Sequence, residues 1–264
     1  MDEWAFIENQ LSVTSRFVRE HYAMRDSVSV SSKVDLNDVL TEVDAAVQAM
    51  IIEAIHQHFP GDAIVAEESG YDHMPDDPRR RCWVIDPIDG TQNFVRGLFP
   101  VFGTSVAFME GGELRAGGIG LPIPGDRFLA ARGQGATRNG APIRVKESAS
   151  LAASRLELDV SHQAHRPEVV RRFGDLMGLF GQVRVAGAAT IGLAAVACGE
   201  ADAYVHVGLK LWDHAAGVLL VEEAGGTVTR LDGSTLDLTM LTTDLAVSNG
   251  AIHAEMLSGI LPGR

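Results

Sequence analysis

Residues 82–94, CWVIDPIDGTQNF, run from an apolar stretch into two closely spaced aspartates, Asp86 and Asp89. Two like charges in a half-dry place repel each other, so a positive partner is expected between them. Carboxylate oxygens are the ligands that hard cations such as Mg²⁺ prefer. Gly90 permits close backbone approach, and a helix beginning at Thr91 would present free N–H groups to an anion. The segment predicts a metal ion beside a phosphate group.

A simpler interpretation of the same segment is a capped helix. Asp89 would then be the N-cap, and Asp86 would only accept hydrogen bonds from turn amides. Pro87 has no backbone N–H, so strand pairing is expected to end there and to leave Asp86 at the rim of a sheet. Further acids at Glu67, Glu68 and Asp213 favour the interpretation as a metal site over that as a capped helix.

Two further acidic positions follow or begin apolar elements. Glu67 and Glu68 end the strand-like run AIVAEE, where alternation places them on opposite faces, so at most one enters a shared site. A solvated strand end is the alternative for this pair. Asp213 begins the apolar helix LWDHAAGVLLVEEAGG, either as a cap or as a ligand. The small residues at 215–217 would let this helix pack closely and carry Asp213 into a cleft.

Composition limits the kind of partner. The 264 residues are 46% hydrophobic and 22% charged, which is ordinary for a globular protein. A formal net charge of −13 disfavours nucleic acid and anionic membranes as partners, because both require clustered Lys and Arg. Cys82 and Cys198 predict reduced thiols rather than a disulfide framework. The acidic start without a signal peptide, and the lack of a long apolar run, predict a cytoplasmic protein that does not span a membrane.

Periodicity predicts an α/β fold with two layered subdomains. Helical spacing is found at 4–24 and 39–59, and short strand-like runs follow at 63–68, 82–86, 103–110, 114–122 and 127–132. Beyond a boundary near 145–153, strands at 155–160, 182–187, 201–207 and 226–231 alternate with helices at 167–179, 190–199 and 213–224. We expect an α+β subdomain over 1–148 that carries most metal ligands, and an α/β subdomain over 149–264 that completes the site in the cleft between them.

The motifs resemble those of the inositol monophosphatase family. WVIDPIDGTQNF, AEES and WDHAAGVLLVEEAGG occur in the family's order and spacing, and KVDLNDVLTEVD resembles its N-terminal loop and helix, with Lys33, Asp38, Thr41 and Asp44 in place. The resemblance covers nearly the whole chain. It implies a layered αβαβα sandwich of the inositol monophosphatase and fructose-1,6-bisphosphatase type. It also implies a Mg²⁺-dependent, lithium-sensitive phosphomonoesterase that is usually a homodimer.

The resemblance also implies a set of metal ligands for two to three Mg²⁺ ions per subunit. The first ion would be held by Glu68, Asp86 and the carbonyl of Ile88. The second would be held by Asp86, Asp89 and Asp213, with Asp86 bridging. A third, weaker ion would lie near Glu68, served by a mobile loop around Lys33. Glu67 would support these ligands from outside the site.

Catalytic and substrate-binding roles carry over by position in the same way. Thr91 and Asp44 would orient and deprotonate the attacking water, with help from Glu68, and the amides of Gly90 and Thr91 would bind phosphate. Two ions about 3.5–4 Å apart are suited to an in-line displacement at phosphorus. The remaining substrate contacts implied by the resemblance are Asp89, Gly187, Ala188, Ala189, His206 and Asp213.

The substrate side departs from the family at one position. His206 occupies a place where inositol-specific members carry a glutamate; it can donate or accept a hydrogen bond, or it is a plain strand residue. His214 is a site-lining residue, a support for the ligands, or a helix-surface residue. The segment 158–168, after Asp159, stays unassigned.

The sequence therefore predicts a Mg²⁺-dependent hydrolase of a small phosphorylated metabolite, with inositol-1-phosphate as the default substrate. Histidinol phosphate, fructose-1,6-bisphosphate and 3′-phosphoadenosine 5′-phosphate are alternatives within the same chemistry. A role as an accessory protein in RNA synthesis is the alternative of another class.

Overall fold

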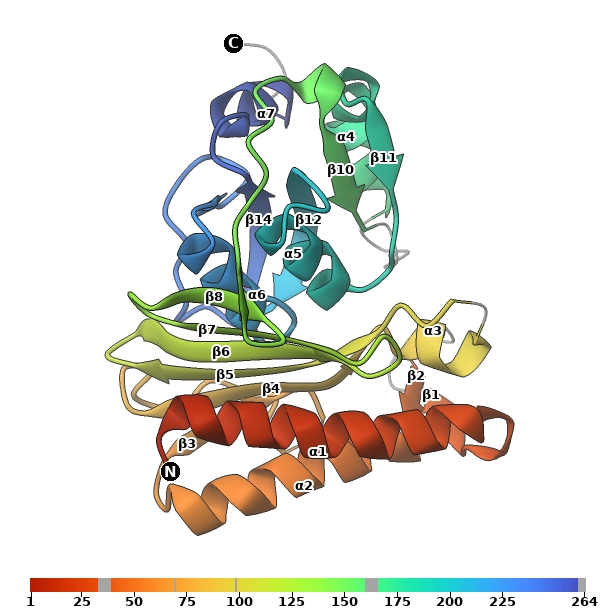
Figure 1. The fold of residues 1–264 in the computed structure, drawn as a ribbon, viewed down its shortest axis with the longest axis vertical. Helices are drawn as coiled ribbons and strands as arrows, with labels where there is room; N and C mark the ends of the chain where they lie inside the picture. Colours follow the sequence, from red (N-terminus) through yellow and green to blue (C-terminus); the bar gives the residue numbers. More distant parts are fainter. Residues whose placement is uncertain (33–38, 69, 98, 160–165, 261–264) are drawn as a thin grey trace.

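The computed structural model describes residues 1–32, 39–68, 70–97, 99–159 and 166–260. Five layers stack along the long axis of the molecule (Figure 1). Helices α1 and α2 cover one face of a seven-stranded sheet, α5 and α6 fill the space between this sheet and a five-stranded one, and α4 and α7 cover the far side. This arrangement is the predicted αβαβα sandwich.

The outer helices of the first layer bury one apolar face each. Helix α1 (Glu3–Ala23) begins at Asp2, whose carboxylate accepts a hydrogen bond from the Ala5 nitrogen at 2.8 Å. Helix α2 (Glu42–His58) buries a row of apolar residues four positions apart, which is the spacing of one helix face: Val43, Val47, Ile51 and Ile55. The predicted helix at 39–59 begins three residues late, because Val39–Thr41 (β2) pairs with Val30–Ser32 (β1) instead.

The first sheet has the strand order β3-β4-β5-β6-β7-β8-β9. Its strands are Ala63–Ala66 (β3), Cys82–Asp89 (β4), Gly103–Glu110 (β5), Glu113–Leu121 (β6), Asp126–Ala131 (β7), Gly135–Arg138 (β8) and Ala141–Ile143 (β9). Only the β3–β4 pair is parallel, and the remaining neighbours are antiparallel. The sheet is the α+β unit that the first half of the sequence predicts.

Strand β4 differs from the prediction at Pro87. Pairing with β5 does not end there: Asp86 lies opposite Ser105, the register shifts, and pairing resumes with Asp89 opposite Gly103. The missing N–H of proline is tolerated because it falls in this irregularity, where the ladder has no bond to lose. The residues between Asp86 and Asp89 have no partner on β5, and they bend the strand so that the carboxylates of both aspartates belong to the same end of β4.

The second sheet has the order β11-β10-β12-β14-β13. Its strands are Arg155–Leu158 (β10), Gln182–Arg184 (β11), Ala203–Lys210 (β12), Thr227–Thr229 (β13) and Thr242–Ser248 (β14). The helices around it are Arg166–Leu179 (α4), Ala189–Ala197 (α5), Leu211–Glu223 (α6) and His253–Ile260 (α7). The three strands β10, β11 and β12 are parallel, as βαβ connections require, but β14 runs antiparallel to β12. Strand β14 is absent from the predicted elements, although it lies inside the sheet.

Helix α6 packs against the first sheet with very little space between them. A Cβ added at Gly117 on β6 would lie 3.1 Å from the Ala216 Cα, and one added at Gly217 would lie 2.5 Å from the Leu193 side chain. The small residues at 215–217 thus do what the sequence suggested: they let α6 lie directly on β6 and against α5.

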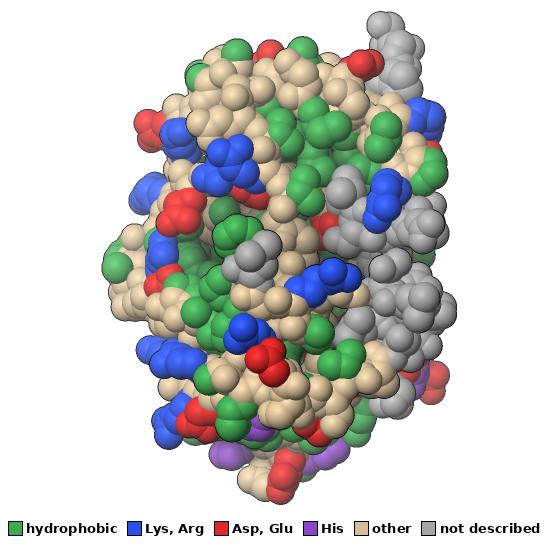
Figure 2. Space-filling model, turned by 90° about the vertical axis from the view of Figure 1, so that its right-hand side faces the viewer, with side chains coloured by type: hydrophobic (Ala, Val, Ile, Leu, Met, Phe, Trp, Pro, Cys, Tyr) green, Lys and Arg blue, Asp and Glu red, His purple; other side chains and the backbone are tan. Residues whose placement is uncertain are grey.

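The two sheets come from chain segments before and after residues 144–154. The division into subdomains at 148/149 stays a prediction. No helix in the described ranges is long and apolar enough to cross a lipid bilayer. On the face shown in Figure 2, Lys and Arg side chains are interspersed with Asp and Glu, and the described part of that face has no continuous basic stripe.

Candidate active site

Asp86 and Asp213 meet between the first sheet and α6. Asp86 is 1% exposed, and its carboxyl group lies near enough to that of Asp213 for the two negative charges to repel each other. Burial, followed by the negative charges of Glu67 and Asp89, raises the pKa of Asp86 well above its ordinary value, and burial with Asp89 and Glu67 does the same for Asp213. A cation bound between the carboxylates would relieve this repulsion.

Asp213 also helps to begin its helix. It lies at the third position of α6, and its Oδ2 accepts a hydrogen bond from the Lys210 nitrogen at 3.0 Å. The capping interpretation and the ligand interpretation are therefore compatible, because capping uses one carboxylate oxygen and leaves the other near Asp86.

Asp89 is held by the second half of the chain. Its Oδ2 accepts hydrogen bonds from the nitrogen and the Oγ1 of Thr190, both at 2.6 Å. Burial raises the pKa of Asp89 to about 7, although the Thr190 bonds oppose the shift. The alternative in which Asp89 caps the next helix is wrong: the N-cap of α3 (Thr91–Arg96) is Gly90, in the left-handed region at φ 88°. Asp89 instead accepts a hydrogen bond from the Thr190 nitrogen, which has no partner within α5 because it lies in the first turn of that helix.

Asp44 and Thr91 form a pair beside these acids. Thr91 Oγ1 lies 3.0 Å from Asp44 Oδ1 and 2.9 Å from the Ile88 carbonyl oxygen, so its single proton is donated to one or the other. The other oxygen of Asp44 accepts hydrogen bonds from the nitrogen and hydroxyl of Thr41, which fixes the carboxylate at the start of α2. Burial first, with Glu67 adding to it, raises the pKa of Asp44 to about 7.

The two glutamates after β3 differ in their surroundings. Val65 pairs with Val84 and faces α6, whereas Ala66 pairs with Ile85 and faces α2. The Glu67 nitrogen donates to the Ile85 carbonyl at 3.2 Å, which continues the pairing and sets Glu67 beside Asp86. Strand β3 ends at Ala66, and beyond it Glu67 keeps a backbone bond to β4 while the Glu68 backbone is bound to α2.

The charges and contacts of the two glutamates agree with this geometry. Glu67 is among the main causes that raise the pKa of Asp44, Asp86, Asp89 and Asp213, whereas Glu68 is among them for Asp44 alone and is the weakest there. The Glu68 backbone is bound to α2, since its nitrogen donates to Gln48 Oε1 at 2.9 Å and its oxygen accepts from Gln48 Nε2 at 3.3 Å. The arrangement favours Glu67, not Glu68, as the acid nearest the cluster.

Gly90 lies against the segment that precedes α5. A Cβ at Gly90 would come within 2.9 Å of the Val101 oxygen and 3.0 Å of the Ala188 side chain, so only glycine fits. Asn93 on α3 reinforces this contact by donating from Nδ2 to the oxygens of Val101 at 2.7 Å and Ala186 at 2.9 Å. Gly187, Ala188 and Ala189, which the sequence places at the substrate, thus lie directly beside the proposed phosphate-binding turn.

The floor of the site is formed by β12. His206 is 5% exposed, with its ring 6.2 Å from that of Tyr204. The Tyr204 hydroxyl has no hydrogen-bond partner among the described residues, and burial together with Asp159 and Asp89 raises its pKa well above the ordinary value. The negative charge of Asp159 acts on both Asp89 and Tyr204, so this residue of the segment left unassigned in the sequence contributes to the electrostatics of the site.

His214 lies beneath the cluster and is 1% exposed, which excludes the helix-surface alternative. Burial first, with His206 adding to it, lowers the pKa of His214 to about 3, so the ring is neutral. Lys33 and Asp38, the two loop residues of the N-terminal motif, lie outside the residues that the structure describes.

The donor set suits a hard divalent cation. It consists of carboxylates and carbonyls with no cysteine among them, and Asp86 Oδ1 is buried without a hydrogen-bond partner in the described part of the chain. Within the described ranges, no three His, Cys, Asp or Glu side chains already stand in a metal-binding arrangement, so binding would draw the carboxylates together. The raised pKa values of Asp86, Asp89 and Asp213 mark where positive charge is needed.

Three contacts of the site are missing from the sequence predictions. Thr190 and Asn93 act on residues about a hundred positions away, and no local pattern signals such a contact. Tyr204 stands two positions before His206 on one strand, so strand alternation applied to His206 could have placed it on the same face.

Comparison with known proteins agrees with this geometry. The model of the inositol monophosphatase family matches residues 1–261. A Thermotoga maritima protein named fructose-1,6-bisphosphatase/inositol-1-monophosphatase is 34% identical over 258 residues, which cover 97% of this chain and 95% of that protein. The Nus factor SuhB of Pseudomonas aeruginosa is 38% identical over 213 residues, 79% of this chain and 78% of that protein.

Solved structures show the same fold. An inositol monophosphatase from Thermotoga maritima superposes with a TM-score of 0.86 at 34% identity, covering 98% of this chain and 97% of that one. The order of the motifs, the five-layered fold and the match along almost the entire length agree with one another. The chain belongs to the inositol monophosphatase family and is a phosphoric monoester hydrolase.

Proposed function

We propose that the chain is a Mg²⁺-dependent phosphatase of a small phosphorylated metabolite. One observation carries the proposal: the Thr91 hydroxyl lies 3.0 Å from the buried Asp44 carboxylate, beside the carboxyl groups of Asp86, Asp89 and Asp213. A hydroxyl held between a base and a metal-binding cluster is the arrangement that activates water at phosphorus.

Two to three Mg²⁺ ions would bind among these carboxylates. The proposed ligands are Glu67, Asp86, Asp89, Asp213 and the Ile88 carbonyl, and Asp86 would be shared between two ions. Glu67 takes the place that the sequence assigned to Glu68, because its charge acts on every member of the cluster. Bound Mg²⁺ would supply the positive charge that lets a phosphate dianion approach so acidic a site and that stabilises its oxygens during the displacement.

The protein groups position water and phosphate. Thr91 orients a water molecule, and Asp44 takes the proton through the Thr91 hydroxyl, a role for which a pKa of about 7 suits a base. The backbone amides of Gly90 and Thr91 hold the phosphate group. The water oxygen forms the new bond to phosphorus, the ester P–O bond breaks, and the products are an alcohol and inorganic phosphate.

Inositol-1-phosphate is the substrate we propose first, in keeping with the name of the Thermotoga relative. The segment 187–189 and His206 would contact the alcohol part, and the absence of a glutamate at 206 leaves histidinol phosphate, fructose-1,6-bisphosphate and 3′-phosphoadenosine 5′-phosphate as alternatives. Phosphate release from these four compounds, with and without Mg²⁺ and Li⁺, tests the proposal. We expect Mg²⁺ to be required, Li⁺ to inhibit, and inositol-1-phosphate to be turned over fastest; release without divalent metal would refute the metal assignment.

A second candidate function is an accessory role in RNA synthesis, for which the observation is the 38% identity to a protein named Nus factor. Capture with the Asp89→Asn variant tests it independently of catalysis. Specific recovery of RNA polymerase subunits would support this role, and their absence from both the variant and the wild type would oppose it. A homodimer and a cytoplasmic location also stay proposals; sedimentation velocity and fractionation test them.

A further inference from the structure

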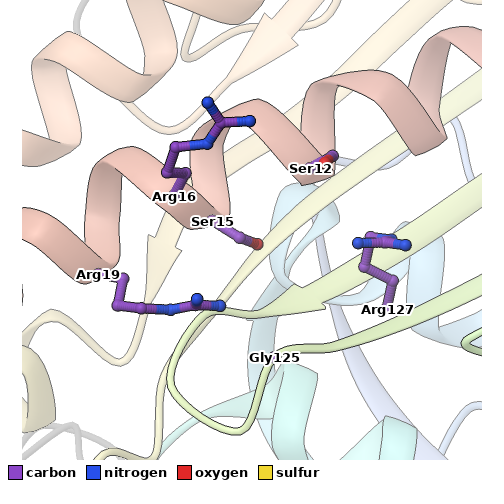
Figure 3. A pocket seen from close by; sticks show the side chains of 6 residues that line it. All are labelled: Ser12, Ser15, Arg16, Arg19, Gly125 and Arg127. Carbon is purple, nitrogen blue, oxygen red and sulfur yellow. The ribbon is translucent and has the colours of Figure 1, made fainter.

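A pocket of about 200 Å³ lies between α1 and the turn that joins β6 to β7. Its lining is basic and hydroxylic (Figure 3): Ser12, Ser15, Arg16, Arg19, Gly125 and Arg127. The lining holds three arginines and no acid, in a chain with 22 basic and 35 acidic residues. Arg81 and Arg138, by contrast, each contact carboxylates.

The pocket is separate from the carboxylate cluster. Helix α1 covers the face of the first sheet opposite to α6, and α6 carries Asp213. The helical part of the lining consists of residues 12, 15, 16 and 19, which share one face because their spacing is three, four and seven. The other wall is Arg127, at the second residue of β7.

Arg127 and Ser15 meet over a glycine. Arg127 pairs with Gly120 on β6, and Ser15 Oγ would lie only 3.0 Å from a Cβ at Gly120. The missing side chain leaves room for both groups above the strand. The backbone of Arg127 is fixed, since its nitrogen donates to Asn139 Oδ1 at 2.9 Å and its oxygen accepts from the Asn139 nitrogen at 2.8 Å.

Arg19 is oriented toward the same space. Its Nε donates to the Pro122 oxygen at 2.9 Å, and its Nη2 lies 3.5 Å from the position of a Cβ at Gly125. One hydrogen bond thus anchors the side chain at the β6–β7 turn and leaves its terminal nitrogens at the edge of the pocket. The guanidinium plane is preorganised for a ligand with several acceptor oxygens.

Two polar atoms in the pocket are buried without a partner. Ser15 Oγ and Arg127 Nε have no hydrogen bond within the described part of the protein, and Ser15 as a whole is 7% exposed. Arg16, Arg19 and Arg127 form no ion pair with any described acid. Buried donors normally have acceptors, so Ser15 Oγ and Arg127 Nε call for one, and the exposed guanidinium groups of Arg16 and Arg19 beside them favour an acceptor with negative charge.

We propose that this pocket binds the phosphate group of a small anion, either inorganic phosphate or a phosphorylated metabolite, at a second site apart from the active centre. Three guanidinium groups supply donors only, the two hydroxyls can donate as well, and arginine matches phosphate oxygens in pairs. The volume exceeds that of the phosphate group alone, so a substituent on the phosphate can also be accommodated.

Calorimetric titration of the metal-free full-length protein in EDTA tests the site, with inorganic phosphate in one arm and glycerol 1-phosphate in the other. Without Mg²⁺ the carboxylate cluster repels both ligands, so saturable binding reports the arginine pocket. We expect one site per chain, weakened about tenfold or more by Arg127→Gln and by Arg16→Gln. Arg16 is exposed, so its variant tests the pocket without disturbing the fold.

Arg115→Gln is the matched control, because Arg115 is an exposed arginine of the same sheet that pairs with Glu113 at 3.0 Å. It should leave the affinity unchanged within about twofold. Tighter binding of glycerol 1-phosphate than of phosphate would identify a metabolite as the ligand, and equal binding would identify the free anion. Lack of saturable binding in both arms would overturn the proposal. So would equal affinity in wild type and both pocket variants, or loss of binding in Asp213→Asn instead.

Discussion

The Asp89 carboxylate accepts two hydrogen bonds of 2.6 Å from Thr190, a residue 101 positions further along the chain. One comes from the backbone nitrogen at the start of α5 and the other from the side-chain hydroxyl. Both favour the charged carboxylate and so oppose the effect of burial on its pKa. The second half of the protein thereby fixes a proposed metal ligand of the first half and favours its ionised form.

Thr190→Val should raise the Mg²⁺ concentration required for half-maximal activity by about 10- to 100-fold, as is typical when a partner of a metal ligand is removed. The backbone bond remains, so the fold should be kept. Thr190→Ser restores the hydroxyl and should restore the Mg²⁺ dependence. The measurement is activity as a function of Mg²⁺ concentration for the wild type and both variants. A curve for Thr190→Val that matches the wild type would show that the hydroxyl does not position Asp89.

Asp89→Asn should lower phosphate release by about a thousandfold or more, because a neutral amide cannot replace a carboxylate that neutralises a divalent cation. Circular dichroism should show a folded protein. Asp237→Asn is the matched control, since Asp237 lies in a surface turn and accepts from the Thr239 nitrogen at 2.9 Å. Near-normal turnover by Asp89→Asn would refute its role as a ligand.

Glu67→Gln and Glu68→Gln should differ in their effect on metal binding. Glu67 lies beside Asp86 and acts electrostatically on the whole cluster, so its variant should show the larger rise in the Mg²⁺ requirement. Glu68→Gln should have the smaller effect, because the Glu68 backbone is bound to Gln48 on α2. Titration of both variants with Mg²⁺ compares them directly, and the opposite order would restore the assignment made from the sequence.

Thr91→Ala and Asp44→Asn should each lower the turnover number by about 10²–10⁴-fold, the usual contribution of a positioned base. Because the two groups act as a unit across a 3.0 Å contact, the double variant should be little worse than the worse single one. Thr91→Ser keeps the hydroxyl and should retain activity. Additive losses in the double variant would mean that the two residues act independently.

In EDTA, Asp44→Asn should become more stable relative to wild type as the pH rises from 5 to 7. The pKa of Asp44 is raised from 3.8 to about 7 by burial, so between these values the folded state binds a proton that the unfolded chain releases. Wild-type stability therefore falls with rising pH, by up to about 1.4 kcal/mol per pH unit. The pKa of His214 is lowered to about 3, so its contribution to stability rises with pH instead. Both proteins contain His214, so this contribution cancels in the difference between them.

Urea unfolding of both proteins at three pH values measures this difference. Mg²⁺ should reduce the slope in wild type, since a cation replaces the proton in stabilising the cluster. A stability gap that is constant between pH 5 and 7 would contradict the raised pKa of Asp44.

Much of the fold follows from patterns within single segments. The first helix, predicted for 4–24, is Glu3–Ala23, and the strand predicted for 103–110 is Gly103–Glu110, because each has an uninterrupted period and a clear end signal. Strand β14 was not predicted because its outer part, Thr242–Asp244, is polar and leaves only three apolar residues before Ser248. Its place beside β12 depends on tertiary contacts that a short local pattern does not encode.

The residues of the site also fall into two groups: those that a local pattern predicts and those that depend on the assembled sheet. Asp86, Asp89 and Asp213 stand out in the sequence because acids at the ends of apolar runs are conspicuous. The choice between Glu67 and Glu68 could not be made there, since alternation separates the two faces without saying which one meets α6. The register of β3 against β4 supplies that information, and it exists only once the sheet is assembled.

The contact between Gly117 and Ala216 places α6 on β6 with no room for another methyl group. Asp213 belongs to the same helix, three residues before Ala216. A side chain at 117 would therefore shift the helix that carries Asp213, and so change the distance between Asp213 and Asp86, even where the core could absorb the added volume. As the family diverges, residues 117 and 216 would therefore have to stay small. The first property lost on enlarging either one would be the spacing of Asp86 and Asp213, and the stability of the fold would suffer only later.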